Sequence, residues 1–168
     1  MKRVIALLME NQPGALSRVV GLFSQRGYNI ETLIVAPTSD PTLSRLTMTT
    51  IGDEKVVQQI TKQLDKLIDV VTVSDLGESD FVERELMLVK LNKGSIAIDE
   101  IEQLEGKVVF EDNKIINLQF VGEPDKLDKL VENLKTKEPL EIVRSGSLGI
   151  SSNSVSYTHL TLPTICSV

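Results

Sequence analysis

The chain has 168 residues, 41% of them hydrophobic, and a mean hydropathy of +0.03, values typical of a globular protein with one ordinary domain or two small ones. No apolar stretch reaches the ~18 residues that a membrane-spanning helix needs, so we expect a cytoplasmic protein. Acidic residues outnumber basic ones by 24 to 18, and the net charge of −6 argues against nucleic-acid binding, which normally leaves a basic footprint.

Histidine and cysteine are confined to the end of the chain. The only histidine is His159 and the only cysteine is Cys166, so positions 1–150 contain neither residue type. Zinc sites, cysteine nucleophiles and histidine-based catalytic triads need these side chains. All three are therefore excluded from the body of the chain, and a single cysteine also excludes an intrachain disulfide.

The first half of the sequence predicts the order β-α-β-β-α-β. Leu16, Val19, Val20 and Phe23 have the spacing of one helix face, whereas alternation around Leu46 predicts a half-buried strand. The predicted elements are strand 3–10, helix 14–26, strand 29–37, a turn at 38–41, strand 43–51, helix 53–67 and strand 69–76.

The turn between the first strand and the first helix predicts a site for a small zwitterion. Pro13 suits the first helical position, and Gly14 has no Cβ to keep a ligand from the backbone. Free N–H groups at a helix N-terminus favour a carboxylate, and the Asn11 amide can both donate and accept hydrogen bonds. These are the groups that a free amino acid needs.

The second half predicts a repetition of the same order, which makes the fold α+β with two ferredoxin-like βαββαβ domains. Pro124 again stands where a helix would begin. The predicted elements are strand 82–90, a short helix 95–105, strand 107–111, a turn at 112–113, strand 115–121, helix 124–135 and strand 139–144. Because units of ~70 residues bury limited core, we also expect at least a homodimer.

The predicted domain boundaries follow these elements. Residues 1–76 form the first domain, 77–81 a linker, and 82–150 the second domain. Residues 151–168 carry no charged side chain apart from one histidine, and we interpret them as a disordered extension of foreign origin. A native flexible tail is the alternative.

Three motifs resemble the small regulatory subunit of acetolactate synthase, also called acetohydroxyacid synthase. They are Asn-Gln-Pro-Gly-Ala-Leu-Ser-Arg-Val at 11–19, Phe-Ser-Gln-Arg-Gly-Tyr-Asn-Ile at 23–30, and the Ala-Pro-Thr at 36–38 followed by Asp-Pro-Thr-Leu-Ser-Arg at 40–45. Residues 1–76 resemble an ACT domain, a regulatory βαββαβ module, and 82–146 resemble the C-terminal domain of the same subunit. The segment 92–106 is shorter than expected for this family.

This resemblance implies a non-catalytic subunit in branched-chain amino acid biosynthesis. Such a subunit binds and activates a large catalytic subunit, which carries thiamine diphosphate, Mg²⁺ and FAD, while the small subunit has no cofactor or metal of its own. Feedback inhibition by valine or a related branched-chain amino acid is implied as well. The implied effector site lies between two paired ACT domains and contains Asn11, Gly14, Ala15, Leu16 and Ser17 of one chain with Asn29 and Ile30 of the other.

Simpler interpretations exist for the same residues. Gly14 could serve only a turn, Asn11 only a helix cap, and Leu16 and Ile30 only the core. An ACT regulator of another biosynthetic enzyme is the main alternative function, followed by a stand-alone ferredoxin-like enzyme of the acylphosphatase type. An RNA-binding βαββαβ module is disfavoured, because strands 3–10 and 43–51 contain no aromatic residue on which bases could stack.

Overall fold

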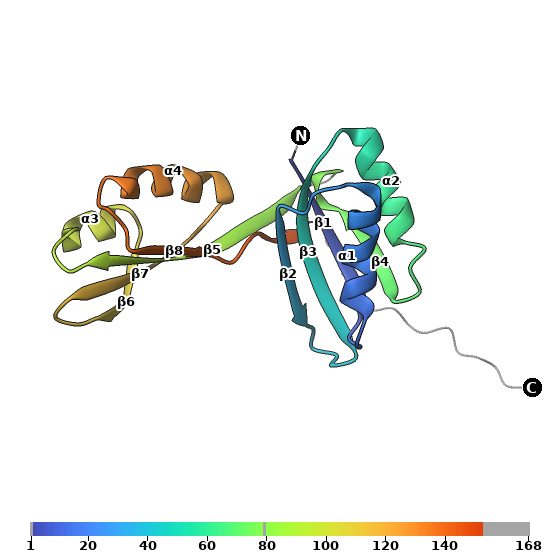
Figure 1. Cartoon of the computed structure of the whole chain (residues 1–168), viewed down its shortest axis with the longest axis horizontal. Helices are drawn as coiled ribbons and strands as arrows, with labels where there is room; N and C mark the ends of the chain where they lie inside the picture. The colour runs from blue at the N-terminus through green and yellow to red at the C-terminus, as the bar shows by residue number, and fades with distance from the viewer. Residues whose placement is uncertain (1, 79, 153–168) are drawn as a thin grey trace, which may run out of the picture.

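The computed structural model describes residues 2–78 and 80–152 and confirms two βαββαβ units with antiparallel sheets (Figure 1). The first unit contains β1 (Lys2–Glu10), α1 (Ala15–Arg26), β2 (Thr32–Pro37), β3 (Leu43–Ile51), α2 (Glu54–Leu64) and β4 (Val70–Asp75). A 3₁₀ turn, η1 (Leu76–Glu78), follows. The second unit contains β5 (Phe81–Asn92), α3 (Ile98–Gln103), β6 (Lys107–Glu111), β7 (Ile115–Gly122), α4 (Pro124–Lys135), β8 (Glu141–Arg144) and β9 (Leu148–Ser151).

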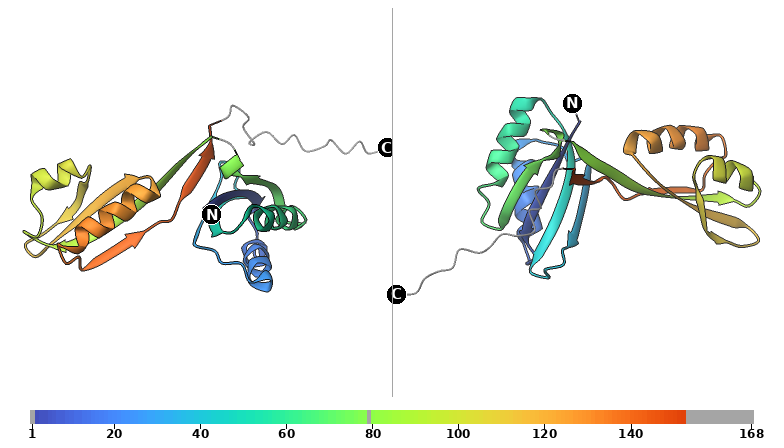
Figure 2. Two further views of the ribbon diagram at one scale, coloured as in Figure 1. Left: turned by 90° about the horizontal axis from the view of Figure 1, so that it is seen from above. Right: turned by 180° about the vertical axis from the view of Figure 1, so that it is seen from behind.

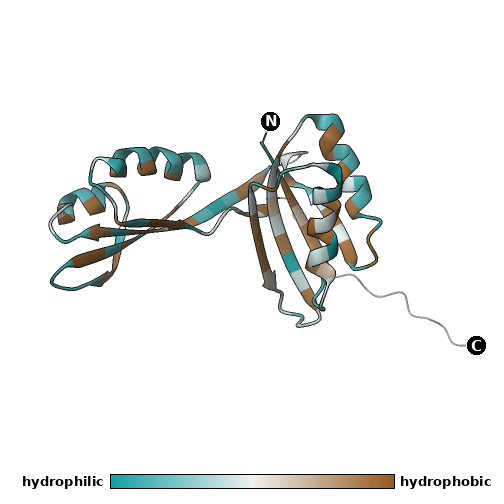
Figure 3. Ribbon diagram, viewed as in Figure 1, coloured by the Kyte–Doolittle hydropathy of each residue, from teal (hydrophilic) through white to brown (hydrophobic). Residues whose placement is uncertain are grey.

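The two sheets have equivalent strand orders, β2-β3-β1-β4 in the first and β6-β7-β5-β8 in the second. In each unit the helices cover one face of the sheet, and their apolar residues are on the side that meets it (Figure 3). The first core is built around Phe23, Leu46 and Ile60, and the second around Leu118, Phe120 and Leu127. Each unit thus has its own hydrophobic core.

Strand β5 connects the two units as one continuous strand (Figures 1 and 2). Its residues 81–84 pair with β9, while residues 85–92 pair with β7 and residues 87–90 with β8. Strand β9 was absent from our prediction. Ser151, which we had assigned to the extension, is its last residue, and residues 153–168 of that extension lie outside the described part of the chain.

Several predicted elements have different ends in the structure. Strand β2 begins at Thr32 instead of residue 29, and helix α2 ends at Leu64 instead of residue 67. The predicted helix 95–105 is reduced to the six residues of α3, because Ser95 closes a turn onto Asn92 and Glu105 already has φ of +57°. Asp53 caps α2 by accepting a hydrogen bond from the Val56 N–H at 2.8 Å.

Candidate functional site

The turn between β1 and α1 places a glycine directly before the helix. Gly14 precedes the first residue of α1 with φ of 90° and ψ of −17°, a left-handed conformation that strains any residue with a Cβ. Asn11 is anchored to the turn before β3: its N–H donates to the Thr42 carbonyl at 2.7 Å and its Nδ2 donates to the Pro41 carbonyl at 3.0 Å. Pro13 lies in the turn and not at the first helical position, which is occupied by Ala15.

A buried carboxylate holds this turn in place. Asp69, only 2% exposed, accepts hydrogen bonds from Arg18 Nε, from Arg18 Nη2 at 2.8 Å and from Gln12 Nε2 at 2.8 Å. The Arg18 guanidinium lowers the pKa of the Asp69 carboxyl, with a smaller contribution from Gln12, so Asp69 is ionised near neutral pH. The network connects the turn and α1 to the residue that precedes β4.

The predicted site residues of this turn differ in what they expose. Asn11, Gly14, Leu16 and Ser17 are exposed, whereas Ala15 is completely buried and its N–H donates to the Gln12 carbonyl at 3.2 Å. The Ala15 N–H is therefore used by the turn and is not among the free N–H groups that a carboxylate could reach at this helix end. The N–H groups of Leu16 and Ser17 have no acceptor among the described residues, so the open end of α1 lies one residue further along.

The other two predicted site residues lie in the segment that leads into β2. Asn29 is exposed, its carbonyl accepts a hydrogen bond from Thr50 Oγ1 at 2.7 Å, and its Nδ2 donates to Glu31 Oε1 at 2.6 Å. Ile30 is half-buried against the first core. Asn29 is thus held at the end of β3 by Thr50, and Ile30 by packing against the first core.

Within one chain the two groups of residues are far apart. Asn11 is bonded to Thr42, directly before β3, whereas Asn29 is bonded to Thr50 near its far end. Eight residues of extended strand at ~3.3 Å each place these anchors roughly 26 Å apart. A single small ligand therefore cannot contact both groups in the same chain.

The chain matches known families in both units. Residues 5–72 match the AHAS small subunit-like ACT domain, and residues 84–153 match the family described as small subunit of acetolactate synthase. A relative in Salmonella typhimurium, acetolactate synthase isozyme 3 small subunit, is 49% identical over 156 residues, which cover 90% of this chain and 96% of the relative. The chain belongs to the acetolactate synthase small subunit family.

More distant members of the family support the same assignment. A probable acetolactate synthase small subunit of Archaeoglobus fulgidus is 38% identical over 154 residues, or 89% of this chain and 96% of the relative. The crystal structure of the acetolactate synthase small subunit from Thermotoga maritima superimposes with a TM-score of 0.82 at 30% identity, over 92% of this chain and 99% of that chain. The match therefore extends over both units of the small subunit.

The residues that support the turn were not predicted from the sequence. Gln12, Arg18 and Asp69 form its polar network, yet Asp69 is 51 residues from Arg18 and no local pattern connects them. The only signal in the sequence was an acidic residue directly before the apolar strand β4. The burial of this residue is visible only in the structure.

Among the described residues no cluster of histidine, cysteine, aspartate and glutamate could hold a metal ion, and no helix is long and apolar enough to cross a membrane.

Proposed function

We propose that this chain is the regulatory subunit of an acetolactate synthase and binds a branched-chain amino acid between two copies of its ACT domain. It associates with the thiamine-diphosphate-dependent large subunit, raises its activity, and inhibits it when valine or a related amino acid is bound. The reaction, with thiamine diphosphate, Mg²⁺ and FAD, belongs to the large subunit, and this chain contributes no catalytic residue. The cytoplasmic location stays a prediction.

The observation that carries this proposal is the separation of the site residues along β3. Strand β2 lies at the edge of the first sheet, and its Pro37 pairs with Ser44, at the same end of the sheet as Asn11. Antiparallel pairing of two β2 strands about a two-fold axis sets Thr32 of one copy opposite Pro37 of the other. Such a dimer brings Asn29 and Ile30 of the second copy toward the turn of the first.

The chemistry of the two halves suits an aliphatic amino acid. The N–H groups of Leu16 and Ser17, at the positive end of the helix dipole, are placed to hold the carboxylate. The exposed amides of Asn11 and Asn29 can bond to the ligand's polar atoms, and Leu16, 37% exposed, offers apolar contact. Each pocket then uses residues from both chains.

Regulation follows from this arrangement by linkage. An effector shifts an equilibrium only by its differential affinity for the two states, and a pocket shared by two chains changes whenever the chains move relative to each other. The coupling is reciprocal: if the effector changes the affinity for the large subunit by some factor, binding of the large subunit changes the affinity for the effector by the same factor.

Mixing two site variants tests whether the pocket is shared. Gly14→Asp puts a carboxylate where the ligand carboxylate is expected, and Asn29→Ala removes an amide from the other half. Either homodimer should activate the large subunit and resist valine. In an equimolar mixture about half of the dimers are mixed and contain one intact pocket of two, so about a quarter of all pockets should bind valine.

The readouts are valine binding by calorimetry and valine inhibition of the holoenzyme. Recovery of about a quarter of the sites on mixing supports a pocket built from both chains. No recovery would place the pocket within one chain, and normal inhibition of the Gly14→Asp homodimer would remove the site from this turn.

A further inference from the structure

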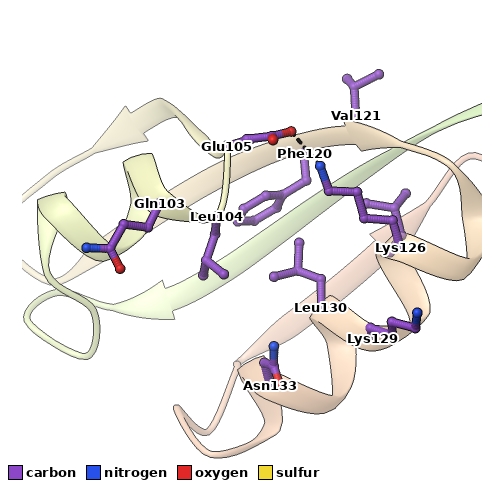
Figure 4. Close-up of a pocket in the computed structure, with 10 residues that line it drawn as sticks. Gln103, Leu104, Glu105, Phe120, Val121, Lys126, Lys129, Leu130 and Asn133 are labelled. Carbon is purple, nitrogen blue, oxygen red and sulfur yellow. Dashed lines mark hydrogen bonds and ion pairs between the residues drawn. The ribbon is translucent and has the colours of Figure 1, made fainter.

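The second unit contains a cavity of about 200 Å³ that is separate from the effector site (Figure 4). It lies between the end of α3, strand β7 and helix α4. Its floor is apolar and its rim carries charged and amide groups. The floor includes Leu104, Phe120 and Leu130, and the rim includes Glu105, Lys126, Lys129 and Asn133. Leu127 also lines the cavity.

The cavity follows from the shortness of α3. Helix α1, the equivalent element of the first unit, has twelve residues and a length of ~18 Å, whereas α3 has six residues and a length of ~9 Å. The cavity lies between residues 104–105, which follow α3, and helix α4.

The backbone that borders the cavity has a conformation that is uncommon for its residues. Glu105 has φ of +57°, a left-handed conformation in which glycine is usual after a helix. Gly106 follows, and its N–H donates to the Ile101 carbonyl at 2.8 Å. A Cβ at Gly106 would lie 2.5 Å from Phe120 Cε1, so the chain passes closely over the floor of the cavity.

The rim has a net positive charge. Lys126 Nζ is 2.5 Å from Glu105 Oε2, so these two charges compensate each other across the opening. Lys129 has no carboxylate partner among the described residues. Two lysines and one glutamate leave one uncompensated positive charge above an apolar floor, which is the environment that a monoanion with an apolar body requires.

We propose that this cavity binds a small monocarboxylate with an apolar body of about six carbons. The body contacts Leu104, Phe120 and Leu130, and the carboxylate bonds to Lys129. The cavity volume equals that of about seven water molecules at ~30 Å³ each. A ligand of about six carbons fits this volume, whereas a nucleotide is too large. The site is in the other unit from the effector turn, and it stands whether or not that turn binds valine.

Methyl NMR of the full-length chain tests the site with 4-methylpentanoate as the probe and 4-methylpentanamide as the uncharged control. With ¹³C-methyl leucine, the acid at a Kd of about 1 mM should shift the signals of Leu104, Leu127 and Leu130. The amide should bind about fivefold more weakly, because it lacks the charge that Lys129 recognises. Absence of shifts at these leucines, or equal binding of acid and amide, would overturn the proposal.

Two variants of α4 separate the charge contact from general effects. Lys129→Gln should weaken binding of the acid about fivefold and leave the weak binding of the amide unchanged. Lys135→Gln is the matched control. Lys135 is on the same helix but does not line the cavity, and its Nζ lies 2.5 Å from Glu132 Oε1. Equal affinities in Lys129→Gln and the unmodified chain would overturn the proposal, as would an equal loss in Lys135→Gln.

Discussion

The two units have the same strand order but differ in how the sheet face opposite the helices is covered. In the first sheet, Val4 and Ala6 are 4% and 3% exposed and form a small cluster with Leu76 and Phe81. In the second sheet, the corresponding face carries Leu86, Leu88, Val121 and Val143, which are 37% to 53% exposed. One sheet is therefore buried on both faces and the other on one.

The cover of the first sheet comes from the end of the second unit. The backbone of Gly149 in β9 approaches so closely that a Cβ there would lie 2.6 Å from Leu76 Cδ1 and 3.3 Å from Val4 Cγ1. Arg45 Nη2 also donates to the Gly149 carbonyl at 3.0 Å. Two sheets of the same strand order therefore have unequal cores, because one is completed by a strand that lies outside its own βαββαβ unit.

The largest effect is expected from a charge placed on each of these faces. Ala6→Lys puts an ammonium in the covered face, where it has no partner, and should destabilise the fold by about 4 kcal/mol. Leu88→Lys puts the same charge on the open face, where it reaches water, and should cost less than ~0.5 kcal/mol. Urea unfolding of both variants measures the difference, and similar losses would show that the two faces are equally covered.

The next largest effect is expected from the ion pair that joins β5 to the end of β8. Glu85 is 4% exposed and accepts hydrogen bonds from Arg144 Nε at 2.9 Å, from Arg144 Nη2 at 2.6 Å and from the Gly146 N–H at 3.1 Å. Arg144→Met leaves this carboxylate buried without its cation, so the free energy of unfolding should fall by about 3 kcal/mol.

Two further variants define that result. Glu85→Gln together with Arg144→Met removes both charges and keeps an acceptor for Gly146, so it should recover part of the loss. Lys90 is on β5, like Glu85, and forms an exposed ion pair with Glu141 of β8. Lys90→Met breaks this pair and should lower the free energy of unfolding by less than ~1 kcal/mol. Equal losses for Arg144→Met and Lys90→Met in urea unfolding would contradict a special role for the buried pair.

Two glycines with nearly the same φ angle allow the contact between the units to be tested. Gly146 has φ of +84° and a Cβ there would lie 3.0 Å from Thr32 Cβ in β2, whereas Gly94 has φ of +87° and open space around it. Gly94→Ala should cost about 1 kcal/mol for the left-handed conformation alone, and Gly146→Ala about 2 kcal/mol. If melting shows equal losses, Gly146 and Thr32 do not touch.

The sequence predicts most of the elements because their signals are local. Leu16, Val19 and Phe23 mark α1 by their spacing, and Leu46 and Met48 mark β3 by alternation. Strand β9 escaped prediction because four residues containing a glycine have no periodicity, and the strand is stabilised by pairing with β5, which lies more than 60 residues earlier.

The sequence proposes residues for the candidate site but not their arrangement in space. Resemblance identifies Asn11, Gly14 and Asn29, yet only the register of β3 reveals that the first and the last of them lie at opposite ends of one sheet. The Asp69–Arg18 pair depends in the same way on contacts between residues far apart in sequence. Information of this kind is absent from periodicity and from short motifs.

The smallest effect is expected from acid titration of the pair that holds the effector turn. The pKa of Asp69 is lowered in the folded chain by Arg18 and Gln12, so the stabilisation is complete above the carboxyl's ordinary pKa and is lost as pH falls through the lowered value. Asp69→Asn should therefore lower the melting temperature slightly near neutral pH, where the ionised carboxylate stabilises the fold, and should flatten its fall in acid, where the unmodified chain loses the same contribution. Asp112 in the second unit is the matched control, because the N–H groups of Ile115 and Lys114 lower its pKa. Asp112→Asn should flatten the fall of melting temperature in acid and leave valine binding unchanged. Asp69→Asn should flatten that fall and also weaken valine binding. Unchanged valine binding in Asp69→Asn would show that the turn keeps its shape without the pair.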